Sequence, residues 1–278
     1  MRKVGSMDEV FAALQAVKSK ASAYCTNFFP VPNKLLARIE EGQLFVDASP
    51  DAVVFLNPDR DFWRIHFCAA NPAALRRKFE LLATITTDPV VIEIIQPENQ
   101  ADDLLPIIKA IGFRPYARLC RLARAGSAQP AEKTAGAGQA VYAVTADARE
   151  IYELIDASFD RYAEQIPQKA AIEIALKNRQ ILIVKNNRTI AGLLYFETTG
   201  ASSAIRYWLV SQNFRSLSYG SVLMRNYLAA HSAIRRFTLW VMADNEGALQ
   251  KYRHYGYTND GLIDQVLVNE KVNHEIGN

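Results

Sequence analysis

The residues best suited to chemistry lie in two segments of the last third of the chain. Residues 210–221 form a polar stretch that contains Arg215, and residues 245–257 contain Tyr252. The apolar run at 237–242 lies between them and indicates a strand, so each segment follows a strand and opens a helix. Backbone N–H groups at a helix start suit a phosphate group, and a phenol nearby can move a proton. The pattern predicts a phosphate-bearing cofactor with chemistry beside it.

Length and composition are those of a soluble globular protein with two modest domains. The chain has 278 residues, of which half are hydrophobic and 22% are charged. The net charge of +3 is compatible with an anionic ligand. Basic residues occur only in short pairs such as Arg76-Arg77 and Arg235-Arg236, so no nucleic-acid partner is expected.

Cysteine and histidine usage gives no sign of disulfides or metals. Three cysteines are widely separated among apolar neighbours, and the four histidines are scattered without the spacing of a zinc site. The N-terminus lacks an apolar signal core, and no segment has the length and hydrophobicity of a membrane span. We therefore expect no metal, no membrane partner and a cytoplasmic location.

A linker rich in Ala, Gly and Pro divides the sequence. It covers residues 125–139, so we expect an α+β domain at 1–124 and a second domain at 140–278. The expected elements of the first domain are a helix capped by Ser6, a helix at Asn33–Glu41, strands at Gln43–Asp47, Ala52–Leu56 and Phe62–Cys68, a helix from Asn71 to Leu82, a strand at Pro89–Ile95, a helix at Ala101–Ile111, and a closing strand or strand pair at Phe113–Leu122.

The second domain mixes hairpins with αβ units. Its expected elements are a strand at Ala140–Val144, helices at Ala148–Phe159 and Lys169–Lys177, strands at Ile181–Lys185, Ile190–Thr198 and Ala204–Val210, a helix at Gly220–Ser232, a strand at Arg236–Ala243, a helix at Asn245–His254, and strands at Tyr257–Asn259 and Ile263–Val268. The order predicts an α+β fold class: a mixed, mostly antiparallel sheet flanked by helices.

The two halves show a faint internal similarity. When Gly112-Phe113 is aligned with Gly256-Tyr257, a strand and a helix precede each pair. The polar stretch at 210–221 has no counterpart before the strand at Val90–Ile95. A duplication in which only the second copy kept its polar residues explains this. The alternative is that helix, Gly, aromatic and strand follow one another in many unrelated folds.

At about residues 140–268 the chain resembles the GNAT family of acyl-CoA N-acyltransferases. One family motif is Arg/Gln-x-x-Gly-x-Gly/Ala with a preceding Val; Val210, Arg215, Gly220 and Ser221 fit it, and Ser218 stands where glycine is usual. The second motif is met at all five positions, namely Asn245, Ala248, Tyr252, Gly256 and Tyr257.

The resemblance implies acetyl-CoA, or another acyl-CoA, as co-substrate. Backbone groups of the polar stretch would hold its pyrophosphate, and Leu209 and Val210 would pair with the pantetheine arm and polarise the thioester carbonyl. Tyr252 would protonate the departing thiolate. The implied cofactor-binding residues are Leu209, Val210, Arg215, Ser216, Leu217, Ser218, Tyr219, Gly220, Ser221 and Asn245.

The amine must lose a proton, so a base is required. Glu197, near the end of a central strand, is the candidate, with Asp244 and Glu164 as further candidates. Tyr207 and Trp208 could line the acceptor pocket, or could be core aromatics of a strand. Likewise Tyr252 could simply pack a helix on the sheet, and Asn245 could simply cap one.

The expected activity is direct transfer of an acetyl or other small acyl group from CoA to a small-molecule or peptide amine. A homodimer is the candidate assembly. Two alternatives stay open: a non-catalytic acyl-CoA-binding or sensing protein, and a tandem-GNAT aminoacyl or peptidyl transferase. The layout also resembles glycine N-acyltransferase-like proteins, which would imply a larger acyl group.

If the polar loop needs a left-handed residue at Ser218, the serine costs on the order of 1 kcal/mol.

Overall fold

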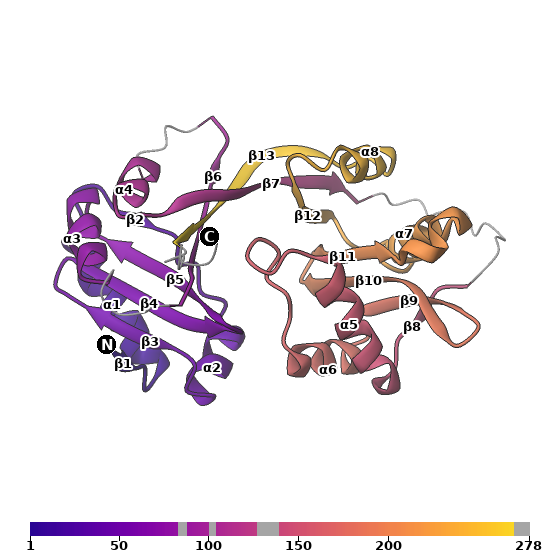
Figure 1. The fold of residues 1–278 in the computed structure, drawn as a ribbon, viewed down its shortest axis with the longest axis horizontal. Helices are drawn as coiled ribbons and strands as arrows, with labels where there is room; N and C mark the ends of the chain where they lie inside the picture. The colour runs from indigo at the N-terminus through magenta and orange to yellow at the C-terminus, as the bar shows by residue number, and fades with distance from the viewer. Residues whose placement is uncertain (83–87, 100–103, 127–138, 270–278) are drawn as a thin grey trace, which may run out of the picture. The chain divides into compact units, whose positions relative to one another are not determined.

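The structure is a computed structural model that describes residues 1–82, 88–99, 104–126 and 139–269. It divides into two compact units. Unit 1 comprises Met1–Arg118 together with the C-terminal residues from Ile263, and unit 2 comprises Leu119–Leu262. Figure 1 labels the helices and strands of both.

Unit 1 is a sheet with helices on both faces. Its elements are β1 (Arg2–Lys3), α1 (Met7–Lys18), β2 (Cys25–Thr26), α2 (Pro32–Glu40), β3 (Phe45–Ala48), β4 (Ala52–Asp59), β5 (Phe62–Ala69), α3 (Pro72–Leu82), β6 (Val90–Pro97) and α4 (Leu105–Ala110). The strand order is β1-β3-β4-β5-β6, followed by the end of β13 (Thr258–Asn269), and β2 pairs with β5.

Alternation along the strands of unit 1 separates its two cores. Val54 and Phe67 belong to the core beneath α3 and α4, whereas Val53 and Phe55 belong to the core beneath α1 and α2. At the start of α1, the Glu9 backbone N–H donates to Ser6 Oγ (3.2 Å) and the Gly5 N–H donates to Glu9 Oε2 (2.8 Å), which confirms the capping predicted at Ser6.

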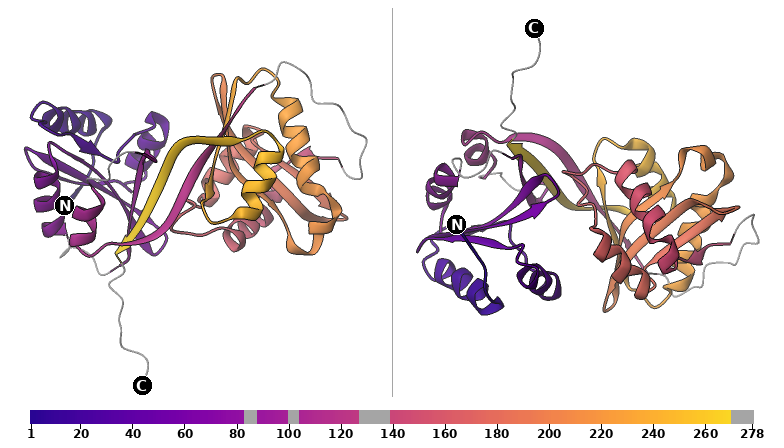
Figure 2. Two further views of the ribbon diagram at one scale, coloured as in Figure 1. Left: turned by 90° about the horizontal axis from the view of Figure 1, so that it is seen from above. Right: turned by 60° about the horizontal axis from the view of Figure 1, so that its bottom comes forward.

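Unit 2 has the same kind of architecture. Its elements are β8 (Val141–Tyr142), the 3₁₀ turn η1 (Thr145–Asp147), α5 (Ala148–Ser158), α6 (Lys169–Lys177), β9 (Ile181–Asn186), β10 (Thr189–Thr199), β11 (Ser202–Val210), the 3₁₀ turn η2 (Gln212–Leu217), α7 (Tyr219–Ala230), β12 (Arg236–Met242) and α8 (Glu246–His254). One core lies under α5 and α6 and a second under α7 and α8, on opposite faces of the sheet (Figure 2).

Each unit contains a strand segment supplied by the other half of the sequence. The end of β7 (Arg114–Ala125) pairs antiparallel with β12, from Leu119 opposite Met242 to Ala125 opposite Arg236. The end of β13 belongs to unit 1, where Leu267 is fully buried in the core. The last strand of each sequence half therefore completes the sheet of the other unit.

The fold class predicted from the sequence is confirmed, and the differences are local. Two strands expected at 257–259 and 263–268 are one strand, β13, and the short strands β1 and β2 were not anticipated. The helix expected at Ala101–Ile111 is described only from Leu105, because 100–103 lie outside the described residues. Most of the expected linker, 127–138, also lies outside them. Within the described ranges, no helix has the length and hydrophobicity needed to cross a membrane.

Candidate functional site

The site begins where two parallel strands of unit 2 part. β11 pairs with β12 from Ser202 opposite Arg236 to Ile205 opposite Leu239, and beyond this point the register ends although both strands continue. The outer edge of β12 remains paired with β7 up to Met242. Tyr207 to Val210 of β11 therefore present a backbone edge toward a gap that opens at the carboxyl ends of both strands. Such edges of αβ sheets are favoured ligand positions.

A β-bulge lies at the point of parting. Tyr195 of β10 is opposite Tyr207, but the next residue, Phe196, is opposite Ile205, so Arg206 is the extra residue. The bulge reverses the alternation of β11. Ile205 packs under α7 and α8, whereas Tyr207 packs under α5 and α6. Bulges of this kind end pairing and re-aim side chains beside functional sites.

The polar stretch leads from the end of β11 into α7. Residues 212–217 form η2, and Arg215, Ser216 and Leu217 are exposed. α7 starts at Tyr219 without a side-chain cap, so its first backbone N–H groups have no side-chain acceptor there. Gly220 lies close under Trp208, because a Cβ at this position would be 3.3 Å from Trp208 Cζ2. The geometry suits an anion approaching an uncapped helix start.

Ser218 has the left-handed conformation considered in the sequence analysis. Its φ is +56° and its ψ is 15°, at the junction of η2 and α7. An L-residue with a Cβ is disfavoured there by on the order of 1 kcal/mol relative to glycine. The left-handed residue redirects the chain from the end of β11 to the start of α7. Ser218 therefore has a strained backbone next to the N–H groups that form the candidate anion site.

Trp208 and Tyr252 meet on the α7–α8 side of this gap. Their ring centroids are 5.3 Å apart, and the Trp208 ring also contacts Tyr255 of α8 at 5.9 Å. Trp208 Nε1 is shielded from solvent and has no hydrogen-bond acceptor among the described residues. A buried donor without an acceptor is unusual and is satisfied when a ligand supplies one. Trp208, which sequence reasoning left undecided, is thus a candidate ligand contact.

The start of α8 lies at the end of β12. The Ala248 backbone N–H donates to Asn245 Oδ1 at 3.0 Å, so this oxygen is the N-cap of the helix. Asn245 is exposed. Because β11 and β12 are parallel, their carboxyl ends place 209–210 and Asn245 at the same sheet edge.

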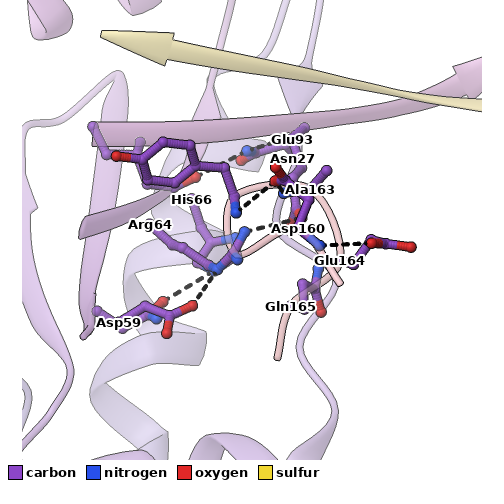
Figure 3. Close-up of polar contacts among 12 residues, drawn as sticks. Asn27, Asp59, Arg64, His66, Glu93, Asp160, Ala163, Glu164 and Gln165 are labelled. Carbon is purple, nitrogen blue, oxygen red and sulfur yellow. Dashed lines mark hydrogen bonds and ion pairs between the residues drawn. The ribbon is translucent and has the colours of Figure 1, made fainter. Parts of the chain in front are cut away.

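A carboxyl group approaches the gap from the α5–α6 side. Glu164 lies in the turn after α5 that Figure 3 shows with Asp160 and Gln165. The Asp160 N–H donates to Glu164 Oε2 at 2.8 Å, and the Tyr207 hydroxyl donates to the main-chain oxygens of Glu164 (2.9 Å) and Gln165 (2.7 Å). This part of the loop is therefore fastened to β11 at the residue that follows the bulge.

The charges of this region act on one another. Burial raises the pKa of Glu164, opposed by the hydrogen bond from Asp160. Burial, and secondarily the Glu164 carboxylate, raises the pKa of Tyr252. Glu164 therefore lies near enough to Tyr252 to affect its pKa, an arrangement in which a base and an acid can serve one reaction.

The other carboxylates considered from the sequence lie elsewhere. Glu197 of β10 is opposite Ala204, in the part of β11 that is still paired with β12, and it is half-buried. Asp244 is exposed in the turn before α8. Burial, and secondarily Glu197, raises the pKa of Tyr195, which is opposite Tyr207. Glu164 carries little sequence signal, because its place depends on a loop contact with Tyr207 that spans 43 residues.

Comparison with known proteins gives a family match and similar folds. Residues 148–257 match the model of the acetyltransferase (GNAT) family. No curated protein matches the sequence. The fold is thus α+β, and residues 148–257 match the GNAT family, as the motifs predicted.

Solved structures extend the likeness over the whole chain. A GCN5-related N-acetyltransferase from Sphaerobacter thermophilus has 16% identity and a TM-score of 0.62, covering 96% of this chain and 94% of that chain. A tandem GNAT protein from the clavulanic acid biosynthesis pathway has 13% identity and a TM-score of 0.62, covering 96% and 97%. At these identities the likeness shows the fold, and it shows that the first half is GNAT-like as well.

Proposed function

We propose that unit 2 transfers a small acyl group, acetyl in the simplest case, from coenzyme A to an amine. The observation that carries the proposal is the parting of β11 from β12 directly beside the uncapped start of α7. A thioester arm can pair with the exposed edge at Leu209 and Val210 while its pyrophosphate lies at the N–H groups of residues 218–221. Arg215, exposed in η2, adds a positive charge near the phosphates.

The shielded Trp208 indole supports the fit of such a ligand. Its N–H has no acceptor among the described residues, and a carbonyl or amide oxygen of the arm would satisfy it. Asn245 offers its amide NH₂ from the α8 side while its oxygen stays committed to the helix cap. Apart from Tyr219, whose hydroxyl accepts from Asn186, the side chains at 216–221 are small or exposed and leave room for the phosphates.

In the proposed reaction the amine nitrogen attacks the thioester carbon, and the carbon–sulfur bond breaks. The Leu209 and Val210 backbone stabilises the developing negative charge on the carbonyl oxygen. Glu164 accepts the proton lost by the amine, and Tyr252 donates a proton to the thiolate. We place the base at Glu164 and not at Glu197, because only Glu164 is held against the edge at Tyr207. Acceptors are small-molecule or peptide amines.

Calorimetry with acetyl-CoA tests the binding step. Ser221→Glu is the informative variant, because glutamate in the first turn of α7 favours the helix but repels a pyrophosphate. Like charges about 4 Å apart repel by about 4 kcal/mol near a protein surface, so affinity should fall at least about 100-fold. Lys251→Gln, at an exposed position on α8, changes the net charge by the same one unit and is the control.

Turnover with a panel of amines tests the transfer step, read as release of free thiol. Thiol release that depends on the amine and is lost in Ser221→Glu would support the proposal. Tight binding of acetyl-CoA without turnover on any amine would instead identify the domain as a binding module.

A further inference from the structure

The parallel strands of unit 1 part in the same way as those of unit 2. β5 pairs with β6 from Trp63 opposite Val90 to Ile65 opposite Ile92, and the register ends there. β5 continues to Ala69 and β6 to Pro97. Since unit 1 is GNAT-like, this is the place that corresponds to the gap between β11 and β12.

In unit 1 this place is filled by Asn27. Its Nδ2 donates to the main-chain oxygens of Ile65 on β5 (3.0 Å) and Glu93 on β6 (3.0 Å), and its Oδ1 accepts from the Phe67 N–H (2.6 Å). Figure 3 shows Asn27 with Glu93. One carboxamide therefore bridges both strands just beyond their last paired residues. An amide of a cofactor arm would have to use these same backbone groups.

The chain that precedes Asn27 runs along β5. Cys25 and Thr26 form β2, opposite Ala69 and Cys68. The Asn27 N–H and Thr26 Oγ1 both donate to the Phe67 oxygen, at 3.2 and 2.8 Å. The β5 edge that faces the gap is thus already paired as a short sheet, whereas the corresponding edge of β11 is not.

The helix start of unit 1 is also committed. Only residues 70 and 71 separate β5 from α3, which leaves no room for a polar loop. Pro72, the first helical residue, has no N–H, and Asn71 Oδ1 accepts the Ala74 N–H at 2.9 Å. The Ala70 oxygen accepts from Ser22 and Ala23 at 3.1 and 3.0 Å, which covers the junction.

We propose that each chain binds a single acyl-CoA, in unit 2, because Asn27 already joins the strands of unit 1 where a second cofactor arm would pair. The part that concerns unit 2 rests on the proposed function, whereas the closure of unit 1 does not. Unit 1 keeps the architecture of an acyltransferase with its cofactor gap permanently closed by its own segment.

Calorimetric stoichiometry with acetyl-CoA tests the single site. The full chain should bind about one equivalent, and Ser221→Glu should bind none. Two equivalents for the full chain, or one equivalent retained in Ser221→Glu, would overturn the inference while leaving coenzyme A binding intact.

Amide hydrogen exchange tests the closure without relying on acetyl-CoA. The Phe67 amide should be protected in the full chain, and its exchange should be at least about tenfold faster in Asn27→Ala. Asn27→Asp, which keeps the acceptor but loses both donated bonds, should leave Phe67 partly protected. Acetyl-CoA should leave the exchange of Phe67 unchanged and slow that of residues 218–221.

The two experiments separate the two proposals. Rapid exchange of Phe67 in the unaltered protein would show an open gap and would refute the closure. Failure of the full chain to bind any acetyl-CoA, with Phe67 protected, would refute the proposed function while supporting the closure of unit 1.

Discussion

The hydroxyl of Tyr207 donates to the main-chain oxygen of Glu164 at 2.9 Å, and so ties the loop after α5 to the strand β11. Tyr207 follows the bulge at which β11 leaves β12. The bulged segment of β11 that opens the gap therefore also fixes the main chain of Glu164. A rigid strand holding a functional loop is a common way to position a catalytic group.

Loss of the hydrogen bond between Tyr207 and Glu164 should lower turnover without affecting cofactor binding. Tyr207→Phe keeps the buried ring but loses the hydroxyl, so Glu164 should shift and kcat should fall about tenfold, less than the roughly 100-fold or greater loss expected when an acid–base group is removed. Affinity for acetyl-CoA, measured by calorimetry, should stay unchanged. Tyr195→Phe is the matched control, because its equally buried ring lies 5.8 Å from that of Tyr207. An equal loss in both variants would point to packing alone.

Glu164 should be visible in the pH dependence of the reaction. A base acts when ionised, and the raised pKa of Glu164 moves its ionisation upward from the ordinary glutamate value. The value of kcat/KM should therefore rise with pH through that raised pKa and then level off. Glu164→Gln should lower kcat about 100-fold and remove this acidic limb.

Glu197→Gln is the comparison for that experiment. It should keep both the rate and the limb, because Glu197 lies opposite Ala204 in the paired part of β11. If the limb disappeared in Glu197→Gln and persisted in Glu164→Gln, the assignment of the base would be reversed.

Tyr252 should be a modest acid. Burial and the Glu164 carboxylate raise its pKa, so transfer of its proton to a thiolate, whose thiol titrates near about 8.5, is uphill. Tyr252→Phe should then lower kcat by only about 10- to 100-fold. Single-turnover kinetics would measure this loss of kcat, and the affinity for acetyl-CoA should stay unchanged. A loss above about ten-thousandfold would mean that the phenol does more than donate this proton.

Ser218 offers a test of backbone strain at the proposed phosphate loop. Ser218→Gly should raise the free energy of unfolding by up to about 1 kcal/mol, because glycine adopts a φ of +56° without a Cβ clash. Acetyl-CoA should bind at least as well. Ser216→Gly, within η2 and without a positive φ, should give no such gain. Weaker binding in Ser218→Gly would identify the serine hydroxyl as a phosphate ligand.

The sequence predicted the parts of the fold that depend on local pattern. The helices after residues 147, 168 and 245 and the strands between them follow from apolar periodicity, and the GNAT motifs placed the polar stretch correctly before α7. The left-handed conformation of Ser218 was considered only because the GNAT motif usually has glycine at this position.

What the sequence did not reveal depends on contacts between distant residues. β2 has two residues and owes its position to Asn27, whose partners Ile65 and Glu93 lie 38 and 66 residues away. The bulge at Arg206 comes from pairing with β10, and the position of Glu164 from the Tyr207 hydroxyl. The exchange of the strands β7 and β13 between units likewise follows from long-range pairing, which the periodicity of apolar residues does not predict.

A buried carboxyl in unit 1 should make stability depend on pH. Asp264 is 6% exposed, and Oδ1 has no hydrogen-bond partner among the described residues. Burial, and then the neighbouring Glu93 carboxylate, raises its pKa well above the ordinary value, while Arg64 opposes the shift. The folded protein thus holds a proton that the unfolded chain releases near about pH 3.9.

The raised pKa of Asp264 sets the direction in which stability changes with pH. The contribution of Asp264 to stability is fully present below the unfolded pKa and is lost as pH rises through the folded pKa, by at most about 1.4 kcal/mol per pH unit. Asp264→Asn mimics the neutral form and keeps an oxygen for the Ile94 backbone hydrogen bond. Thermal unfolding between about pH 4 and 8 should therefore show a variant whose advantage grows with pH.

Asp260→Asn should behave in the opposite way. Asp260 Oδ2 is paired with Arg121 at 2.8 Å and with Arg236 at 2.7 Å, so its loss should destabilise the protein at neutral pH.

A constant difference between Asp264→Asn and the unaltered protein over the whole pH range would mean that Asp264 ionises normally in the folded state. An ionised Asp264 would then need a second positive charge nearby, because Arg64 is already paired with Asp59 and Glu93.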